Sequence, residues 1–290
     1  MYTILTDSCS DLNAQIAARF AQLEVLPLSY TISGQTSTQP FDDAARCSAF
    51  YDRLRAGEMC TTSQVSPGDF AEAFKAHAKK GEAVLGLIFS SALSGTYASA
   101  CMARDMVLEE YPDAVIELVD TLSASAGEGM VVYDALLRRD TGMPIEENAV
   151  YTKAHLQEYA HWFTVDDLHF LKRGGRCSPS AAFFGTMLKI KPVLHVDSEG
   201  RLIARSKVRG RVQALRAIAM KFGELEADKD QVIFISHGDC EKDALLVKDT
   251  LVKTFGCAPE KIFLSAVGPV IGSHSGPGTV ALFFRGKNRG

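Results

Sequence analysis

The sequence predicts an α/β protein of two domains: an N-terminal α/β/α domain around a parallel sheet (residues 1–160) and a C-terminal α/β domain with a mixed sheet (residues 161–290). Two observations favour this fold class. Near-continuous apolar runs at 83–89 and 114–119, each followed by a hydroxyl-rich turn and a helical pattern, are typical of parallel strands buried on both faces. The second half instead holds two extended segments joined by a tight turn, the pattern of an antiparallel hairpin.

In the first domain we expect these elements in order: a strand at 2–6, a helix at 12–22, a strand at 24–32 and a helix at 42–57. The next helix has the clearest start, because Ser66 can cap it, Pro67 suits its first turn and Asp69 complements the helix dipole. The strands at 83–89 and 114–119 precede helices at 98–111 and 130–139. A helix at 153–162 ends this half of the chain.

In the second domain we expect a short helix at 165–171 and then the hairpin, with strands at 190–196 and 202–208 around Gly200. A helix at 212–222, a strand at 232–236, a helix at 242–255 and strands at 262–267 and 279–284 follow. Together they predict a mixed sheet covered by helices.

Composition excludes several classes of protein. The net charge of −4 argues against a general nucleic-acid binder, and seven scattered cysteines without a Cys-x-x-Cys pair indicate reduced thiols. No apolar stretch reaches the roughly 20 residues of a membrane span, and the chain begins without a leader pattern, so we expect a cytoplasmic protein. Nucleotide-binding glycine motifs and histidine pairs at metal-ligand spacing are missing. We therefore expect no metal, no cofactor and no catalytic residue.

Hydroxyl-bearing segments gather where strands end and helices begin. They lie at Asp7-Ser8, 90–96 and 120–125, and in parallel sheets such positions line the ligand-binding edge. The hydroxyls of the segment 61–64 directly precede a helix start, where they could hold a carboxylate or phosphate. Helix capping explains one hydroxyl such as that of Ser66, but not so many at once. His274 lies in a segment with four glycines and two prolines (268–279), which we interpret as a rigid loop of a binding site. The alternative is a small-molecule hydrolase or transferase that uses His274 and a nearby serine.

The segment 168–222 carries twelve Lys or Arg residues and two acidic residues, a local charge of +10. A solvated surface explains any one of these side chains. For the whole segment we expect a partner surface, with an acidic protein, a nucleotide-loaded enzyme or an anionic membrane as candidates. Nucleic acid is disfavoured, because no aromatic residues alternate with the basic ones.

Taken together, the motifs resemble those of the DegV family of bacterial fatty-acid-binding proteins, over essentially the whole chain. The matching segments are Thr6-Asp7-Ser8 with Asp11-Leu12, Thr62-Ser63-Gln64, Leu93-Ser94-Gly95-Thr96-Tyr97 with Ser99-Ala100, Asp120, 168–176, Lys191-Pro192 with Gly200, and 272–278. Two positions depart from the family pattern: Val65 stands where proline is usual, and Cys177 where an aliphatic residue is usual.

The resemblance implies one long-chain fatty acid buried between the two domains and presented to a separate fatty acid kinase, which phosphorylates the carboxylate. Phospholipid metabolism is the implied setting, and the protein itself would be a non-catalytic subunit; a lipid-sensing regulator without a kinase is a third possibility. By motif, Thr62, Ser94 and Gly95 would bind the carboxylate, and we add His274 and Arg176 to that group. Candidate tunnel walls are Phe89, Phe163, Phe183, Phe184, Met187 and Leu188. The basic residues Arg201, Arg205, Lys207 and Arg209 are candidates for docking to the kinase, or transiently to an anionic membrane.

Overall fold

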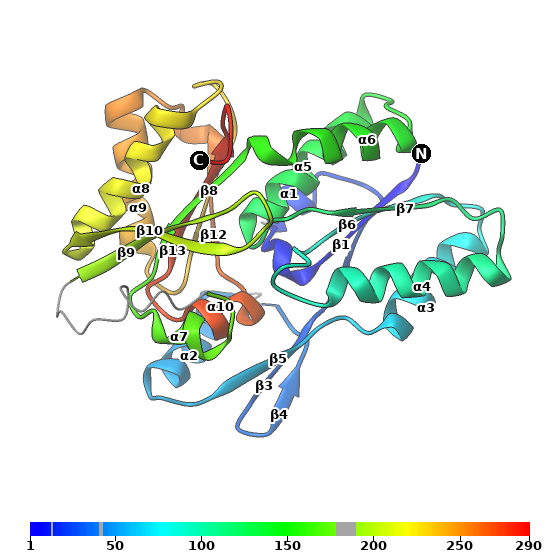
Figure 1. The fold of residues 1–290 in the computed structure, drawn as a ribbon, viewed down its shortest axis with the longest axis horizontal. Helices are drawn as coiled ribbons and strands as arrows, with labels where there is room; N and C mark the ends of the chain where they lie inside the picture. The colour runs from blue at the N-terminus through cyan, green and yellow to red at the C-terminus, as the bar shows by residue number, and fades with distance from the viewer. Residues whose placement is uncertain (13, 41–42, 178–189) are drawn as a thin grey trace.

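The computed structural model describes residues 1–12, 14–40, 43–177 and 190–290, and these residues form three β-sheets (Figure 1). Sheet A is parallel, in the order β2 (Leu23–Leu26), β1 (Thr3–Asp7), β6 (Val84–Ile88) and β7 (Ile116–Asp120). Sheet B is a small antiparallel sheet of β4 (Gln35–Ser37), β3 (Ser29–Ile32) and β5 (Cys60–Ser63). The parallel sheet was expected, whereas the small one was not.

Sheet C is mixed and belongs to the second half of the chain. Its order is β10 (Leu202–Arg209), β9 (Ile190–Val196), β8 (Tyr159–Thr164), β13 (Val280–Arg285), β11 (Ile233–His237) and β12 (Ile262–Ala266). Only the β11–β12 pair is parallel. The predicted hairpin is confirmed as β9 and β10, and Gly200 in its turn has a φ of +80°.

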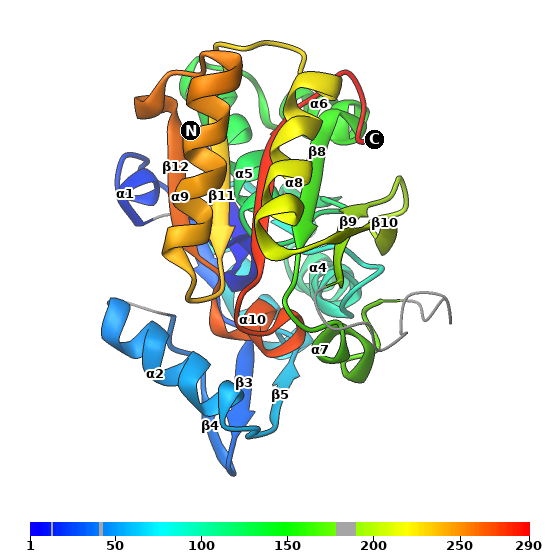
Figure 2. The ribbon, with the colours of Figure 1, turned by 90° about the vertical axis from the view of Figure 1, so that its left-hand side faces the viewer.

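Helices cover both large sheets. Helices α3 (Pro67–Ala78) and α4 (Thr96–Glu110) pack on one face of sheet A, and α8 (Arg211–Leu225) and α9 (Glu241–Thr250) pack on one face of sheet C (Figures 1 and 2). The remaining helices are α1 (Ala14–Ala17), α2 (Ala44–Arg55), α6 (Ile145–His155), α7 (His169–Arg173) and α10 (Pro269–Ser275). Short helical turns are η1 (Ser8–Ser10), η2 (Leu156–Glu158), η4 (Leu251–Phe255) and η5 (Pro259–Lys261).

Helix α5 (Ala126–Asp140) lies between the two large sheets and contacts both (Figure 1). Ten of its fifteen residues are buried, far more than on a helix with one solvated face. Its apolar side chains, including Met130 and Leu136, join the core that spans sheets A and C. The two halves of the chain therefore share one hydrophobic core.

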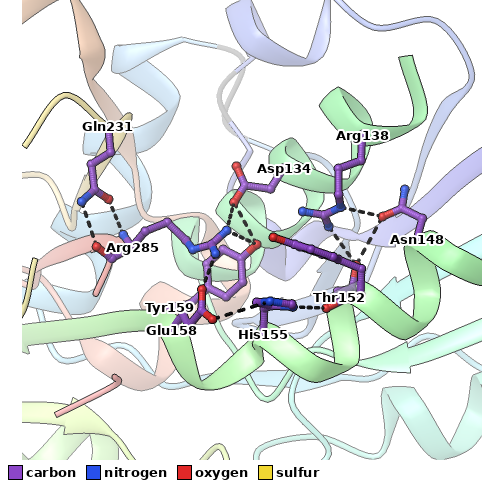
Figure 3. Close-up of polar contacts among 10 residues, drawn as sticks. Asp134, Arg138, Asn148, Thr152, His155, Glu158, Tyr159, Gln231 and Arg285 are labelled. Atoms are coloured by element: carbon purple, nitrogen blue, oxygen red, sulfur yellow. Dashed lines mark hydrogen bonds and ion pairs between the residues drawn. The ribbon is translucent and has the colours of Figure 1, made fainter. Parts of the chain in front are cut away.

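A polar network fixes the outer end of this junction (Figure 3). The guanidinium of Arg285 on β13 donates to Asp134 on α5 at 2.9 Å and also to Glu158, while the Tyr159 hydroxyl donates to Asp134 at 2.9 Å. Arg138, one helical turn beyond Asp134, donates to Asn148 and Thr152 of α6. The network links α5 and α6 to sheet C by side-chain hydrogen bonds.

Four predicted elements were wrong in kind or extent. The segment 24–32 forms two strands in different sheets because Pro27, which has no N–H to donate, separates them. The helix at 12–22 is reduced to α1. The helix at 153–162 ends at His155, and the aromatic-rich segment after it is the fully buried strand β8. The glycine–proline segment forms α10, because Pro269 occupies the first helical turn, as proline readily does.

We also searched the structure for disulfides, metal-binding groups and membrane-spanning helices. All seven cysteines are free thiols. Within the described ranges, no group of three or more His, Cys, Asp or Glu side chains could hold a metal ion, and none of the helices there is long and apolar enough to cross a bilayer.

Candidate fatty-acid site

A cavity of about 360 Å³ lies between sheet A, sheet C and helix α10, a volume within the range of ligand-binding pockets. Its walls come from the carboxyl ends of β5, β6 and β7, from the inner face of sheet C and from α10. Parallel sheets bind ligands at this edge, since their strand-to-helix turns converge there. The cavity therefore lies where the segments 90–96 and 120–125 were expected to meet a ligand, whereas Asp7 and Ser8, at the end of β1, do not line it.

All five predicted carboxylate-binding residues line this cavity: Thr62, Ser94, Gly95, Arg176 and His274. The hydroxyl oxygen of Thr62 and Nε2 of His274 lie 2.7 Å apart, although 212 residues separate them in the sequence. Pairing of β5 with β3 brings Thr62 to this point, and α10 brings His274. Arg176 joins this pair, because it donates to the carbonyl oxygen of Gly174, which packs against His274; we call this cluster of polar groups the head end.

Glycines make the close packing at the head end possible. A Cβ on Gly95 would come within 2.2 Å of the Gln64 side-chain oxygen, and the amide of Gln64 donates to Ser99 at 2.7 Å. Gly95 itself is the residue before the first turn of α4. Free N–H groups at a helix start favour an anion, so this end of the cavity suits a carboxylate.

The charge at the head end is positive. Arg176 is the one cationic residue among the described residues of the cavity wall, and no Asp or Glu accompanies it there. Its guanidinium is oriented by hydrogen bonds to the carbonyl oxygens of Leu93 at 3.2 Å and Gly174 at 2.5 Å. Burial, with the charges of Arg176 and Arg173, lowers the pKa of His274 to about 4, so its ring is neutral at pH 7.

The rest of the wall is mainly apolar. Phe89 and Phe163 line the cavity as expected. The other four predicted wall residues, Phe183, Phe184, Met187 and Leu188, lie outside the described residues. Apolar wall residues that were not predicted as tunnel walls include Leu28, Leu93, Leu171, Val270, Ile271 and Phe283. A cavity with a cationic, hydroxyl-bearing cluster and otherwise mainly apolar walls can accept an amphiphile with an anionic head.

Comparison with known proteins identifies the family. The family model described as "Uncharacterised protein, DegV family" matches residues 1–287. The chain belongs to the DegV family. A DegV domain-containing protein of Clostridium perfringens is 40% identical over 293 residues, which cover 99% of this chain and 98% of the relative. The resemblance inferred from the motifs is thus confirmed.

Solved DegV structures share the fold. A DegV family protein of Thermus thermophilus, described as binding fatty acid, is 32% identical with a TM-score of 0.87 and covers 98% of this chain and 99% of its own. A fatty-acid-binding DegV protein of Streptococcus agalactiae is 29% identical with a TM-score of 0.83, and 99% of each chain is covered. The α/β architecture with a parallel and a mixed sheet is therefore that of two-domain fatty-acid binders.

Seven further polar residues line the cavity in this DegV protein but were not named individually as site residues by the sequence reasoning: Ser63, Gln64, Ser125, His161, Ser236, Ser275 and Thr279. Five of them lie in segments that the sequence did single out, at 61–64, 120–125 and 268–279. His161 and Ser236 gave no distinct signal, because a lone histidine or serine in a strand is usually structural. Only the pairing of strands in sheet C reveals which of them face the cavity.

The basic hairpin of the DegV protein lies at the edge of sheet C and faces solvent at Arg201, Arg205, Lys207 and Arg209. Arg201 forms ion pairs with Asp197 and Glu199 of the same turn, so part of its charge is neutralised locally. The apolar side chains of Val196 and Leu202 in the hairpin line the cavity. The hairpin thus connects the ligand cavity to a positively charged surface.

Proposed function

We propose that this DegV protein binds one long-chain fatty acid in the cavity, with the carboxylate at the head end and the acyl chain along the apolar walls. The observation that carries the proposal is a cluster of polar groups in a mainly apolar cavity: Thr62 contacts His274, Arg176 is anchored beside them, and most of the other wall residues are aromatic or aliphatic. Each buried CH₂ group of a ligand contributes about 0.8 kcal/mol. A chain of 16 to 18 carbons, as a fatty-acid ligand would have, is therefore held mainly by its tail.

The head end supplies what a buried carboxylate requires. An ionised carboxylate without partners is costly to bury, whereas charge-assisted hydrogen bonds from a guanidinium, hydroxyls and a main-chain N–H offset that cost. Thr62, Ser94, Gly95 and Arg176 carry these donors, and they belong to the wall of one cavity. Neutral His274 can accept from or donate to Thr62, and so fixes the orientation of that hydroxyl.

We further propose that the protein presents the bound carboxylate to a separate fatty acid kinase, which phosphorylates it to an acyl phosphate, and that Arg205, Lys207 and Arg209 dock the kinase. Two observations support this role: the basic residues are exposed on the hairpin, and the same hairpin lines the cavity through Val196 and Leu202. A partner on the hairpin would thus lie beside the ligand. The alternative is that the same basic residues bind an anionic membrane while fatty acid is exchanged there.

The rival proposal, a hydrolase or transferase built on His274, has one observation in its favour, the contact between His274 and a hydroxyl. That hydroxyl belongs to Thr62 rather than to a serine. The opposite ring nitrogen, Nδ1, faces Gly174, and an activated nucleophile normally needs an acidic group there to orient the base. Turnover by the isolated chain, abolished in His274→Gln, would favour the rival.

Mass spectrometry of lipid extracted from the freshly purified protein tests the binding proposal. We expect close to one fatty acid per chain. A protein that carries no lipid and also takes up no added octadecanoic acid would contradict it. The kinase role is tested separately, by adding the loaded protein, ATP and a DegV-dependent fatty acid kinase and measuring acyl phosphate.

A further inference from the structure

A buried histidine faces the cavity away from the head end. His161 on β8 is 1% exposed and lines the cavity. The backbone of Tyr159 is the one polar group that acts on its ring among the described residues, and this contact is too poorly aligned to form a regular hydrogen bond. The ring is held edge-on to Phe283, with centroids 5.4 Å apart. Gly127 of α5 packs so closely that a Cβ there would come within 2.2 Å of Nε2. The side chain is therefore fixed in place, and at least one of its ring nitrogens has no partner.

The pairing of strands places His161 along the ligand rather than at its head. His161 lies opposite Phe283 on β13, whereas Thr164 lies opposite Val280, where β13 begins just after α10. Three residues of a strand span about 10 Å, so His161 is that much farther from the α10 end of the sheet. Phe163, two residues along β8, points to the same face and also lines the cavity.

A buried imidazole with an unpaired ring nitrogen is an unfavourable neighbour for a plain hydrocarbon chain, which offers it no hydrogen bond. A buried polar group without a partner loses its hydration and gains nothing in return, whereas an apolar side chain of similar size would not have that cost. Burial, followed by the charge of Arg289, lowers the pKa of His161 well below its usual value, so the ring is neutral, with one N–H that faces the Tyr159 backbone and one bare acceptor nitrogen. A ligand hydroxyl can satisfy the bare nitrogen by donating to it.

We propose that the cavity prefers acyl chains that carry a hydroxyl group part-way along the chain, with His161 as the residue that recognises this hydroxyl. The inference rests on the proposed binding of a fatty acid in this cavity and specifies its chemical class. A wall of hydrocarbon groups discriminates against a hydroxyl by leaving it unpaired, whereas a wall with a matched polar group accepts it. His161 places such a polar group in the cavity wall, so that this part of the cavity accepts a hydroxyl group.

Competitive binding with octadecanoic acid and its 7-, 10-, 12- and 16-hydroxy derivatives tests this inference on the unaltered protein. We expect one interior position at which the hydroxy acid binds as tightly as octadecanoic acid or up to about tenfold tighter, the range that a single internal hydrogen bond produces. Weaker binding at every position, or the same affinity at every position, would overturn it. The latter is the expected result if a water molecule alone satisfies His161.

A variant makes the assignment to His161 specific. In His161→Leu the preference at the best position should fall by about tenfold or more relative to octadecanoic acid. His195→Leu is the matched control, because His195 is 3% exposed, also has an unpartnered ring nitrogen within the described chain, and does not line this cavity. An unchanged preference in His161→Leu would refute its role. Failure of octadecanoic acid itself to bind the unaltered protein would instead count against the proposed function.

Discussion

Gly174 lies against the ring of His274, and a Cβ built on Gly174 would come within 2.3 Å of Nδ1. The glycine follows α7 with ordinary backbone angles (φ −72°, ψ −11°), so space rather than conformation demands it. The same residue accepts a hydrogen bond from Arg176 through its carbonyl oxygen. Gly174 thus holds two head-end side chains in position without touching the ligand site itself.

Gly174→Ala should therefore weaken fatty-acid binding by moving the His274 ring. Overpacking of this kind costs about 1–3 kcal/mol. If this cost destabilises only the complex with fatty acid, the affinity falls by about five- to a hundredfold. Binding of a fluorescent fatty acid measures the effect. Gly68→Ala is the control, because a Cβ there meets the Ser66 hydroxyl at an ordinary 3.6 Å. Unchanged affinity in Gly174→Ala would show that the position of His274 is unimportant for binding.

Thr62→Ala should lower the affinity for fatty acid by about ten- to a hundredfold, because a hydrogen bond to a buried charge contributes about 1.5–3 kcal/mol. It also removes the partner of His274 Nε2. Thr61→Ala is a matched control: it is the same change on the same strand, but the side chain is exposed on the opposite face. Calorimetric titration of the delipidated proteins compares them. Equal losses in both variants would remove Thr62 from the head end.

Replacing Arg205, Lys207 and Arg209 together by glutamine should reduce kinase-dependent acyl phosphate formation while leaving fatty-acid affinity unchanged. The side chains face solvent on the hairpin and do not line the cavity. Removal of rim charges chiefly slows association, and the defect should shrink as salt rises. The control replaces the exposed Lys80, Lys229 and Lys242, which lie elsewhere on the surface, with the same loss of charge. Equal turnover in the two triple variants would exclude the hairpin as the docking surface.

Asp11 predicts a pH effect on stability. Its carboxylate accepts hydrogen bonds from Ser125 at 2.5 Å and from the Gly268 N–H at 2.8 Å, yet burial raises its pKa from 3.8 to about 7. Between about pH 4 and 7 the folded chain keeps a proton that the unfolded chain has lost, so this residue's contribution to stability falls as pH rises through that window. Above about pH 7 the contribution is constant.

Asp11→Asn removes that titration and preserves both contacts, since the amide can donate to Ser125 and accept from Gly268. The free energy of unfolding of the native protein should therefore fall, relative to the variant, from pH 4.5 to 7.5. Denaturant titrations at a series of pH values measure the difference, in which titrations common to both proteins cancel. Asp105→Asn, at an exposed position, should show no such trend. A constant difference between Asp11→Asn and the native protein would contradict the raised pKa.

Local sequence signals were sufficient where one segment determines its own structure. The capped start of α3 is an example, because the reciprocal contacts of Ser66 and Asp69 lie within one turn. The hairpin turn at Gly200 is another, and so are the motifs that place Thr62, Ser94 and His274 in one site. Each of these features is encoded by neighbouring residues or by a motif of fixed spacing.

The features that were missed depend on contacts between distant segments. The first part of β8 was predicted as the end of a helix at 153–162, and only pairing with β9 and β13 defines this segment as a strand. His161 went unrecognised for the same reason, since its face of the sheet follows from that pairing. Sheet B likewise depends on the antiparallel contact of β3 with β5, about 30 residues later in the chain.

The burial of α5 between the two large sheets limits how a ligand can enter and leave. Rotating one half of the molecule away from the other would uncover a helix on which ten of fifteen residues are buried, and would separate Arg285 from Asp134. Such an opening would cost a large part of the stability of the whole fold. The proposed fatty-acid ligand would therefore exchange through small displacements of the cavity wall, and its residence time should depend on the local stability of segments such as α7 and α10 rather than on domain motion.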